Sequence, residues 1–318
     1  MPPRSRRRFI ETSATCASHL AMVGMVARRR GWAWRQAGSV VASEAFGVLQ
    51  RVAEGVWALV STPFEGDRTT LANGGIIAGR EAVLAIEGFY QPAGARWLAE
   101  RAVELTGRRP TVVLLTHYHS DHVNGVAGYH DVPAHPAVRT TAVTRAAVLD
   151  RNTPPDAARD AALTDARLLP PDTSTTLDLG DRHVTVTPFA GHTDSDLIVE
   201  LEDPNVVFCG DLYWNAIFPN YVDAKPAQLA ASVAALKRAR ETQYVPGHGG
   251  VSGADGLASY VSVLEAVEDA ARRAHGAGLT AEEARERFAL PASLGAWTLF
   301  SPAFFPRAFN AWYRELGT

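Results

Sequence analysis

The sequence predicts an α/β protein, because short apolar runs typical of β-strands alternate with segments of helical periodicity. Residues 111–115 form a continuous apolar run of the kind found in strands buried on both faces. The segment Pro92–Thr106 instead places Ala95 and Leu98 on one face of a helix. Turn residues such as Asn73-Gly74-Gly75 separate these elements. Together these three observations give the fold class.

The remaining elements follow from the same two patterns. Further strands are expected at residues 48–60 (two strands around a turn at Glu54-Gly55), 76–78, 82–86, 184–187, 197–201, 206–208 and 244–245. Further helices are expected at about residues 143–165, with an interruption at Pro154-Pro155, and at 227–240, 257–277 and 280–288. The apolar, aromatic segment 297–316 ends the chain.

Composition limits the classes of function. With 318 residues, 47% of them hydrophobic, the chain can bury a substantial core. A formal net charge of −3 favours neither nucleic acid nor an anionic membrane as a partner. The two cysteines, Cys16 and Cys209, are too few for a disulfide framework. We therefore expect a globular protein with a substantial core and with neither nucleic acid nor a membrane surface as its partner.

The N-terminal segment 1–43 has a different pattern. Arg6-Arg7-Arg8 precedes residues 12–27, which hold no Lys, Arg, Asp or Glu but are too few and too polar for a membrane span. This pattern predicts a twin-arginine export signal, hence a periplasmic or otherwise exported protein with no stable membrane span after its removal. The alternative is a disordered basic tail on a cytoplasmic protein. Ala42 and Ser43 lie near the expected junction.

The segment 44–318 is therefore expected to form the folded domain. Its metal-binding core is expected at 46–250 and a C-terminal helical extension at 255–318.

Metal-binding side chains cluster directly after the strand expected at 111–115. His117, His119, Asp121 and His122 lie within six residues. Imidazole nitrogens and carboxylate oxygens are the ligands preferred by borderline divalent ions such as zinc. Three histidines and an aspartate at one strand exit therefore indicate a metal site.

Three later segments repeat this arrangement of a strand, a glycine and a ligand-type side chain. Gly191-His192, Gly210-Asp211 and Gly247-His248 each follow an expected strand. No shared structural requirement explains four such clusters, so we expect them to meet at one edge of a sheet.

The combination HxHxDH, GH, GD and PGHG, in this order, resembles the metallo-β-lactamase-fold superfamily of hydrolases over residues 46–250. The resemblance implies an αββα four-layer sandwich, here with extra C-terminal helices, and two metal ions, most simply Zn²⁺. It implies that His117, His119 and His192 hold the first ion, that Asp121, His122 and His248 hold the second, and that Asp211 bridges both.

This site implies that a hydroxide shared by the two ions attacks a carbonyl group of the substrate. Asp121 would then serve as both ligand and proton relay. Glu87, Thr116 and Ser120 are expected to orient the metal ligands.

Differences between this sequence and known branches of the superfamily narrow the expected substrate class. Zinc β-lactamases of the commonest type carry a cysteine where Asp211 stands, so a dedicated β-lactamase is not expected. The glutathione-binding features of glyoxalase II are missing after His248. An exported hydrolase of esters, thioesters or lactones remains, with β-lactams as a further carbonyl class. Aromatic residues after Asp211 are expected to form a pocket wall, with a packed loop as the alternative: Tyr213, Trp214, Phe218 and Tyr221.

Two other readings stay open. One is a mononuclear iron sulfur dioxygenase of the same fold, although that group uses fewer ligands than His122 and His248 together provide. The other is a non-catalytic metal-binding module, although no expected ligand is missing.

Overall fold

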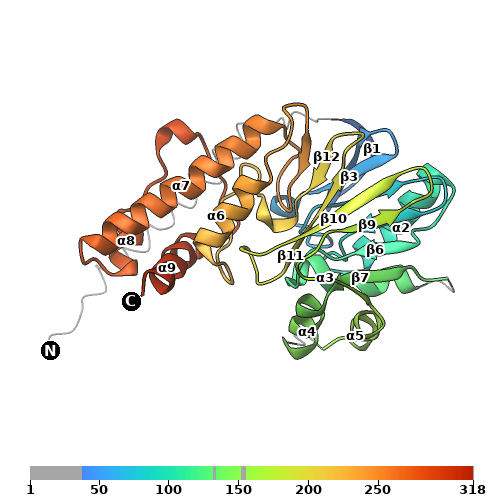
Figure 1. The fold of residues 1–318 in the computed structure, drawn as a ribbon, viewed down its shortest axis with the longest axis horizontal. Coiled ribbons are helices and arrows are strands. Elements are labelled where there is room, and N and C mark those ends of the chain that lie inside the picture. The colour runs from blue at the N-terminus through green and yellow to red at the C-terminus, as the bar shows by residue number, and fades with distance from the viewer. Residues whose placement is uncertain (1–37, 132–133, 152–154, 318) are drawn as a thin grey trace, which may run out of the picture. The chain divides into compact units, whose positions relative to one another are not determined.

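The computed structural model describes residues 38–131, 134–151 and 155–317. Two β-sheets lie face to face, and helices cover their outer faces (Figure 1). In the part of the chain described, no helix combines the length and the apolar character needed to cross a membrane. The expected export signal lies at residues 1–43 and thus almost wholly outside the described residues.

The first sheet has eight strands whose spatial order equals their order in the chain. The first five strands pair antiparallel, and the fifth to eighth pair parallel. The strands are β1 (Ser39–Glu44), β2 (Gly47–Ala53), β3 (Val56–Ser61), β4 (Gly74–Ala78), β5 (Val83–Ile86), β6 (Val112–Leu114), β7 (Ala137–Thr141) and β8 (Arg167–Leu169).

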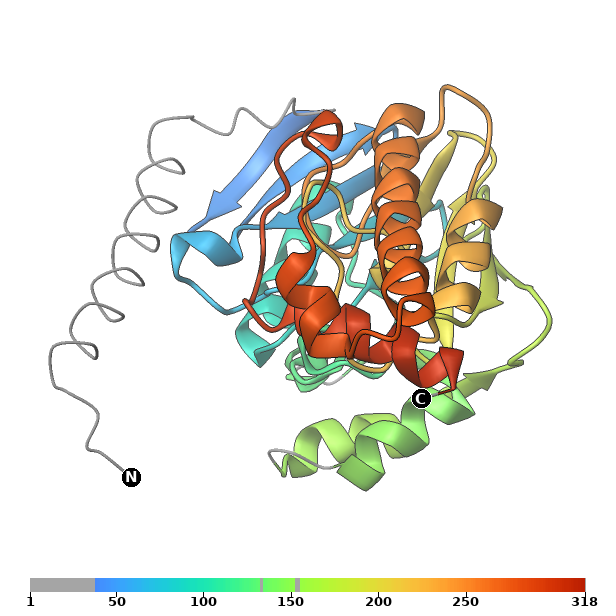
Figure 2. The same cartoon turned by 90° about the vertical axis from the view of Figure 1, so that its left-hand side faces the viewer.

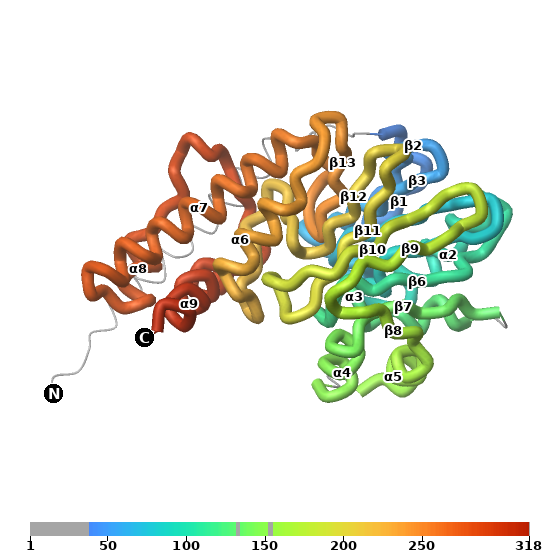
Figure 3. The backbone as a smooth tube through the Cα atoms, in the orientation of Figure 1, coloured from blue at the N-terminus to red at the C-terminus, as the bar shows by residue number. Residues whose placement is uncertain are grey.

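The second sheet has five strands in the order β13-β12-β11-β10-β9, which the tube in Figure 3 shows side by side. All neighbours pair antiparallel except β12 and β13, which are parallel. The strands are β9 (Thr175–Asp178), β10 (His183–Phe189), β11 (Asp196–Leu201), β12 (Val206–Phe208) and β13 (Gln243–Val245).

Helices pack outside both sheets, and Figure 2 shows α7, α9 and the C-terminal segment together on one side. The α-helices are α2 (Pro92–Thr106), α3 (Ser120–Val123), α4 (Ala142–Arg151), α5 (Ala157–Thr164), α6 (Pro226–Ala235), α7 (Ala254–Gly276), α8 (Ala281–Arg287) and α9 (Phe304–Leu316). The 3₁₀ turns are η1 (Pro63–Glu65), η2 (Val126–His130), η3 (Gly210–Leu212) and η4 (Ala292–Leu294). The bounds expected for α2 are confirmed, because Pro92 starts the helix and Gly107, at φ 73°, ends it.

Three apolar layers define the architecture. One cluster, which includes Ile77 and Val199, fills the space between the two sheets. A second cluster joins the first sheet to α2 through residues such as Leu98. A third joins the second sheet to α6, α7 and α9 through residues such as Leu229 and Trp312. The expected αββα sandwich with additional C-terminal helices is therefore confirmed.

The structure corrects the expected domain start. Strand β1 pairs along β2, with Ser43 opposite Val48 and Glu44 opposite Gly47. Residues 39–43 thus belong to the sheet, although we assigned them to the N-terminal segment. Most of β1 is exposed, so it lacks the alternation of apolar and polar residues that marks a half-buried strand.

Candidate metal centre

The end of β6 delivers the first group of ligands. His117 follows the strand after two residues, and His119 precedes α3, which carries Asp121 and His122. His117 and His122 are fully buried, whereas the His119 side chain is 13% exposed. The short helix α3 therefore separates the ligands that follow β6 into two groups, which point toward different positions.

The loop between β10 and β11 brings in His192. Asp196, at the start of β11, accepts hydrogen bonds from the backbone nitrogens of His192 and Thr193, each at 3.1 Å. It also accepts one from Oγ1 of Thr193 at 2.7 Å. The backbone nitrogen of Leu197 donates to the carbonyl of Thr116 at 2.9 Å, which links the two sheets beside the site.

Asp211 lies in η3, directly after β12, and close backbone packing fixes it. Gly210 has φ 50°, a left-handed conformation that favours glycine. A Cβ atom on Gly247 would lie 2.0 Å from Oδ1 of Asp211. The glycines of the GD and PGHG segments thus allow two loops to meet at the metal site, as we expected from the sequence.

His248 follows β13 in a loop that Asn73 holds. The buried Asn73 side chain donates to the carbonyls of Pro246 and Gly249, at 2.8 and 2.7 Å. The Trp214 ring lies against the His248 ring, with 3.9 Å between centroids. Nothing in the sequence pattern connected Asn73 with this loop, because a single asparagine before a strand reads as a turn residue.

The first cluster consists of His117, His119, His192 and Asp211. Nδ1 of His119 lies 3.1 Å from Nε2 of His117 and 2.9 Å from Nε2 of His192. Oδ2 of Asp211 lies 3.2 Å from Nε2 of His192 and 3.8 Å from Nε2 of His117.

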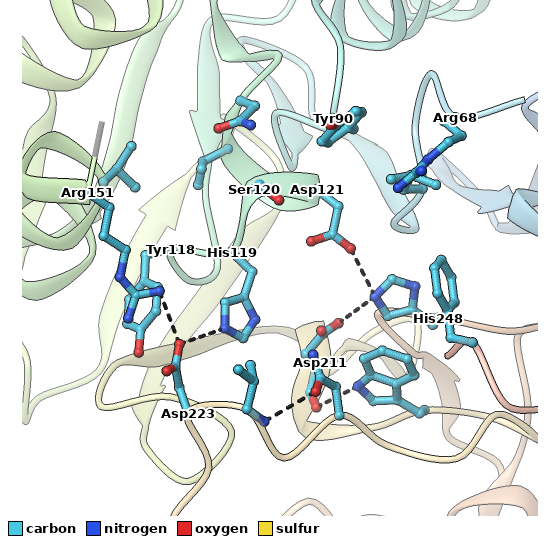
Figure 4. A pocket seen from close by; sticks show the side chains of 18 of the residues that line it. Arg68, Tyr90, Tyr118, His119, Ser120, Asp121, Arg151, Asp211, Asp223 and His248 are labelled. Atoms are coloured by element: carbon cyan, nitrogen blue, oxygen red, sulfur yellow. Dashed lines mark hydrogen bonds and ion pairs between the residues drawn. The ribbon is translucent and has the colours of Figure 1, made fainter. Parts of the chain in front are cut away.

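The second cluster consists of Asp121, His122 and His248, with Asp211 again alongside. Oδ1 of Asp211 lies 3.2 Å from Nε2 of His122 and 3.3 Å from Nε2 of His248. Oδ2 of Asp121 lies 3.3 Å from the same nitrogen of His248 (Figure 4). Asp211 therefore presents one carboxylate oxygen to each cluster.

These distances fit metal coordination. Two ligand atoms each about 2.0–2.1 Å from a tetrahedral ion lie roughly 3.3–3.4 Å apart. The distances between the ligand atoms given above, 2.9 to 3.8 Å, surround that value. Nε2 of His122, Nε2 of His248 and Oδ1 of Asp211 are buried without a hydrogen bond among the described residues. Such convergent, unpartnered polar atoms are costly unless a cation joins them.

The protonation states also suit a cation. Burial and the neighbouring His122 lower the pKa of His117 well below its usual value, so its ring is neutral. Burial alone would raise the pKa of Asp121, but the facing His122 and His248 lower it to about 2. Burial opposes protonation of His248, yet Asp211 and Asp121 raise its pKa to about 9. A proton on His248 thus offsets the negative charge of Asp121 and Asp211, as a bound metal ion would also do.

Glu87 and Thr116 contact ligands of both clusters. Oγ1 of Thr116 lies 2.6 Å from Oε1 of Glu87 and 3.0 Å from Nδ1 of His117. Nδ1 of His122 lies 3.0 Å from the same Glu87 oxygen. Both contacts favour a proton on Nδ1, which leaves Nε2 free to bind a cation. Glu87 adopts φ 77°, an unfavourable backbone conformation for a non-glycine residue, as is common at functional sites.

Replacing Glu87 by glutamine should weaken metal binding at both clusters. The amide keeps one acceptor oxygen but presents an NH₂ group to His122 or Thr116, so the ring orientation is lost. We expect a fall of about 10–100-fold in metal affinity, measured by competition with a chelator of known affinity. Glu81→Gln, at an exposed carboxylate paired with Arg80, is the matched control. An affinity equal to that of the unchanged protein would contradict this role of Glu87.

Ser120 and Asp223 differ from what the sequence suggested. Ser120 is exposed at the cavity, and no described contact joins its side chain to a metal ligand, so its expected orienting role is not seen. Oδ2 of Asp223 instead lies 3.1 Å from Nε2 of His119 and accepts from Nη1 of Arg151 at 3.1 Å. Figure 4 shows His119 between the metal site and Asp223. Asp223 lies alone in a loop, and no residue pattern marked it.

A cavity of about 600 Å³ opens onto both clusters. Among the residues expected to line it, Trp214 does so. Tyr213, Phe218 and Tyr221 do not: each is at most 1% exposed and belongs to the core beneath α6, α7 and α9. The expectation that these three form a pocket wall was wrong, and the packed-loop alternative holds for them. In a sequence, aromatic residues of the core and aromatic residues of a pocket wall have the same pattern.

The C-terminal segment supplies the missing wall. Phe300, Phe304 and Arg307 line the cavity, and the Phe300 ring lies 5.6 Å from that of His248. The rings of Phe304 and Trp214 lie 5.8 Å apart. The helical extension is therefore part of the site, which the sequence did not decide.

Fold and ligand set define an αββα protein with paired clusters of metal-binding residues at the sheet edge. Residues 77–260 match the family model of the metallo-beta-lactamase superfamily, and the chain belongs to this superfamily.

Relatives and solved structures agree with this assignment. The chain is 34% identical over 148 residues to a hydroxyacylglutathione hydrolase of Acidiphilium cryptum, covering 46% of this chain and 53% of the relative. It is 29% identical over 181 residues to one of Parasynechococcus marenigrum, covering 53% and 61%. The chain thus spans between half and two thirds of the length of these relatives.

Two solved structures share the fold. The sec-alkylsulfatase Pisa1 from Pseudomonas sp. superposes with a TM-score of 0.65 at 18% identity, over 85% of this chain and 50% of that one. The metallo-beta-lactamase FIM-1 from Pseudomonas aeruginosa, in its mono-zinc form, superposes with a TM-score of 0.56 at 20% identity, over 68% and 94%.

Proposed function

We propose that this protein is a dinuclear zinc hydrolase that attacks a carbonyl group of a small-molecule substrate and cleaves the acyl bond next to it. The observation that carries the proposal is the Asp211 carboxylate, which presents Oδ2 to one cluster and Oδ1 to the other. A single-metal centre, as in the dioxygenase reading, would leave the three ligands of the second cluster, two of them buried, without a function.

The metal-binding residues and the residues of the cavity wall have separate roles in this proposal. Two bound zinc ions would acidify water and polarise a carbonyl group. The seven residues of the two clusters would hold these ions, and Asp211, whose carboxylate faces both clusters, would contribute a ligand to each. Asp121, whose carboxylate lines the cavity and belongs to one cluster, is placed to hold a proton on its free oxygen and return it to the leaving group. Trp214 and Phe300 pack beside His248 and exclude water from that side.

Esters, thioesters and lactones are the proposed substrate classes, with β-lactams as a weaker one. The thioester class is supported by the similarity to hydroxyacylglutathione hydrolases. A dedicated β-lactamase activity is not proposed, because Asp211 stands where such enzymes carry a cysteine.

Metal removal provides the test. The purified protein should contain close to two zinc ions per chain, and a chelator should abolish hydrolysis of a chromogenic panel of esters, thioesters, lactones and β-lactams. Adding zinc back should restore activity, and the panel then ranks the substrate classes. One iron ion per chain without hydrolysis would support the dioxygenase alternative, whereas bound metal without either activity would support a binding module.

We also propose that the protein is exported through its twin-arginine segment. Since β1 begins at Ser39, a cut that leaves the sheet intact lies before that residue rather than at 42–43. Fractionation of the producing cell, with replacement of Arg6 and Arg7 by lysine, tests the proposal. Full-length protein in the cytoplasm in both cases would contradict it.

A further inference from the structure

Four arginines line the cavity beside the metal clusters, and two of them are paired with carboxylates. Nη2 of Arg159 contacts Asp160 at 2.8 Å, and Nη1 of Arg151 contacts Asp223 at 3.1 Å. Figure 4 shows the second pair on the His119 side of the site. These two guanidinium groups are therefore neutralised by the protein itself.

Arg68 and Arg307 have different surroundings. The Arg68 guanidinium lies over the Tyr90 ring, 5.7 Å from its centroid, and Figure 4 places both on the side of Asp121 and His248. Arg307 lies over Phe304 at 5.6 Å, and its Nη1 donates to Oδ1 of Asn220 at 3.0 Å. Within the described ranges, neither arginine pairs with a carboxylate.

The carboxylates of the cavity do not compensate these two charges. Asp121 and Asp211 belong to the metal clusters, and Asp223 is shared by Arg151 and His119. The bound cations would add further positive charge. A cavity with this balance attracts and retains an anion.

Aromatic rings form part of the wall of the same cavity. The rings of Phe300 and Phe304 stack with 6.3 Å between centroids and 10° between planes. Trp214 lies edge-on to both, at 6.5 and 5.8 Å. Such a wall suits an apolar body attached to the anionic group.

We propose that Arg68 and Arg307 bind an anionic oxygen group of the substrate, away from the bond that is cleaved. The substrate is then an acyl compound with an apolar body and a carboxylate or sulfonate at its far end. This inference rests on the proposed hydrolysis and names its substrate class. Both arginines lie outside residues 77–260, so the superfamily match does not supply this role.

Paired esters test the proposal. The 4-nitrophenyl monoester of adipate, its sulfonate counterpart and 4-nitrophenyl hexanoate differ at the far end of the acyl chain. We expect kcat/KM for the two anionic esters to exceed that for the neutral ester by about tenfold, as befits a charged hydrogen bond at a partly exposed site. Preference for only one anionic ester identifies the group that the two arginines bind. Equal kcat/KM for all three would overturn the proposal while leaving the hydrolase intact.

Variants assign the preference to the two side chains. R68Q and R307Q should each reduce the anionic-to-neutral ratio about threefold and together about tenfold, mainly through KM. R307K should retain more of the ratio than R307Q, because it keeps the charge without the planar fork. R273Q, at an exposed α7 residue paired with Asp269, is the matched control and should keep the ratio. Melting temperatures verify that each variant folds.

A binding measurement separates this proposal from the hydrolysis on which it rests. The ether 6-(4-nitrophenoxy)hexanoate cannot be hydrolysed, and calorimetry on the metal-loaded protein should show it binding at least tenfold more tightly than its amide. That difference should disappear in the R68Q/R307Q double variant. Carboxylate binding that survives in the double variant would point to direct metal coordination and overturn the proposal. A chain that binds the ether as expected but hydrolyses no ester would contradict the hydrolase alone.

Discussion

Asp211→Asn should deplete both metal clusters at once and reduce kcat/KM by on the order of a thousandfold or more. Its carboxylate lies 3.2 Å from His192 in one cluster and 3.2 Å from His122 in the other. An amide offers only one ligating oxygen and no negative charge, so at least one cluster loses a ligand and both lose electrostatic attraction. Losing several kcal/mol of transition-state stabilisation corresponds to this thousandfold fall in kcat/KM.

Elemental analysis and kinetics on the same sample check this expectation. Asp269→Asn removes an exposed carboxylate on α7 and should leave metal content and activity unchanged. Circular dichroism verifies the fold, since Asp211 is only 4% exposed and its loss could disturb packing. Two tightly bound ions in folded Asp211→Asn would show that this residue does not bridge them.

The metal ligands could be predicted because each follows a strand within a few residues. His117 comes after β6, Asp211 after β12 and His248 after β13, so local sequence order carried the information. The face-to-face packing of two sheets then brings these strand ends together. We predicted this packing from the resemblance to the metallo-β-lactamase-fold superfamily, because strand patterns alone do not say which sheets pack against each other.

The residues that hold the ligands could not be found in this way. Asn73 reaches Pro246 across 173 positions, and Asp223 meets His119 across 104. Such contacts depend on tertiary packing, and a single polar residue in a loop has no periodicity to mark it. The same limit explains the misplaced aromatic residues: Tyr213 and Trp214 are adjacent in sequence, yet only Trp214 faces the cavity.

Strands β7, β8 and β9 were also missed. Their sequences are mixed: β7 reads AVRTT and β9 reads TTLD, and β8 has only three residues. Short strands at or near sheet edges need few apolar residues, because one side or both remain partly exposed. Their place in the sheets is defined by pairing with a neighbour: β9 pairs with β10, and β8 pairs with β7.

His119→Ala should empty the first cluster selectively and abolish hydrolysis while the protein stays folded. Nδ1 of His119 contacts His117 and His192 at 3.1 and 2.9 Å, but the second cluster does not include this residue. Arg151 still pairs with Asp223, so the adjoining cavity wall keeps its main contact. The side chain is partly exposed, and its truncation leaves no sealed void in the core.

The expected metal content of His119→Ala is close to one ion per chain, in contrast to the deeper depletion expected for Asp211→Asn. Both variants should lower kcat/KM on the order of a thousandfold. Asp211→Asn changes the residue shared by the two clusters, and His119→Ala removes a ligand of the first ion. His183→Ala, at an exposed histidine on β10, is the matched control and should keep full metal content and activity. If His119→Ala retained full activity with its metal content verified, the dinuclear mechanism would be refuted. If it lost both ions together, the clusters would bind metal cooperatively through Asp211 rather than as separable sites.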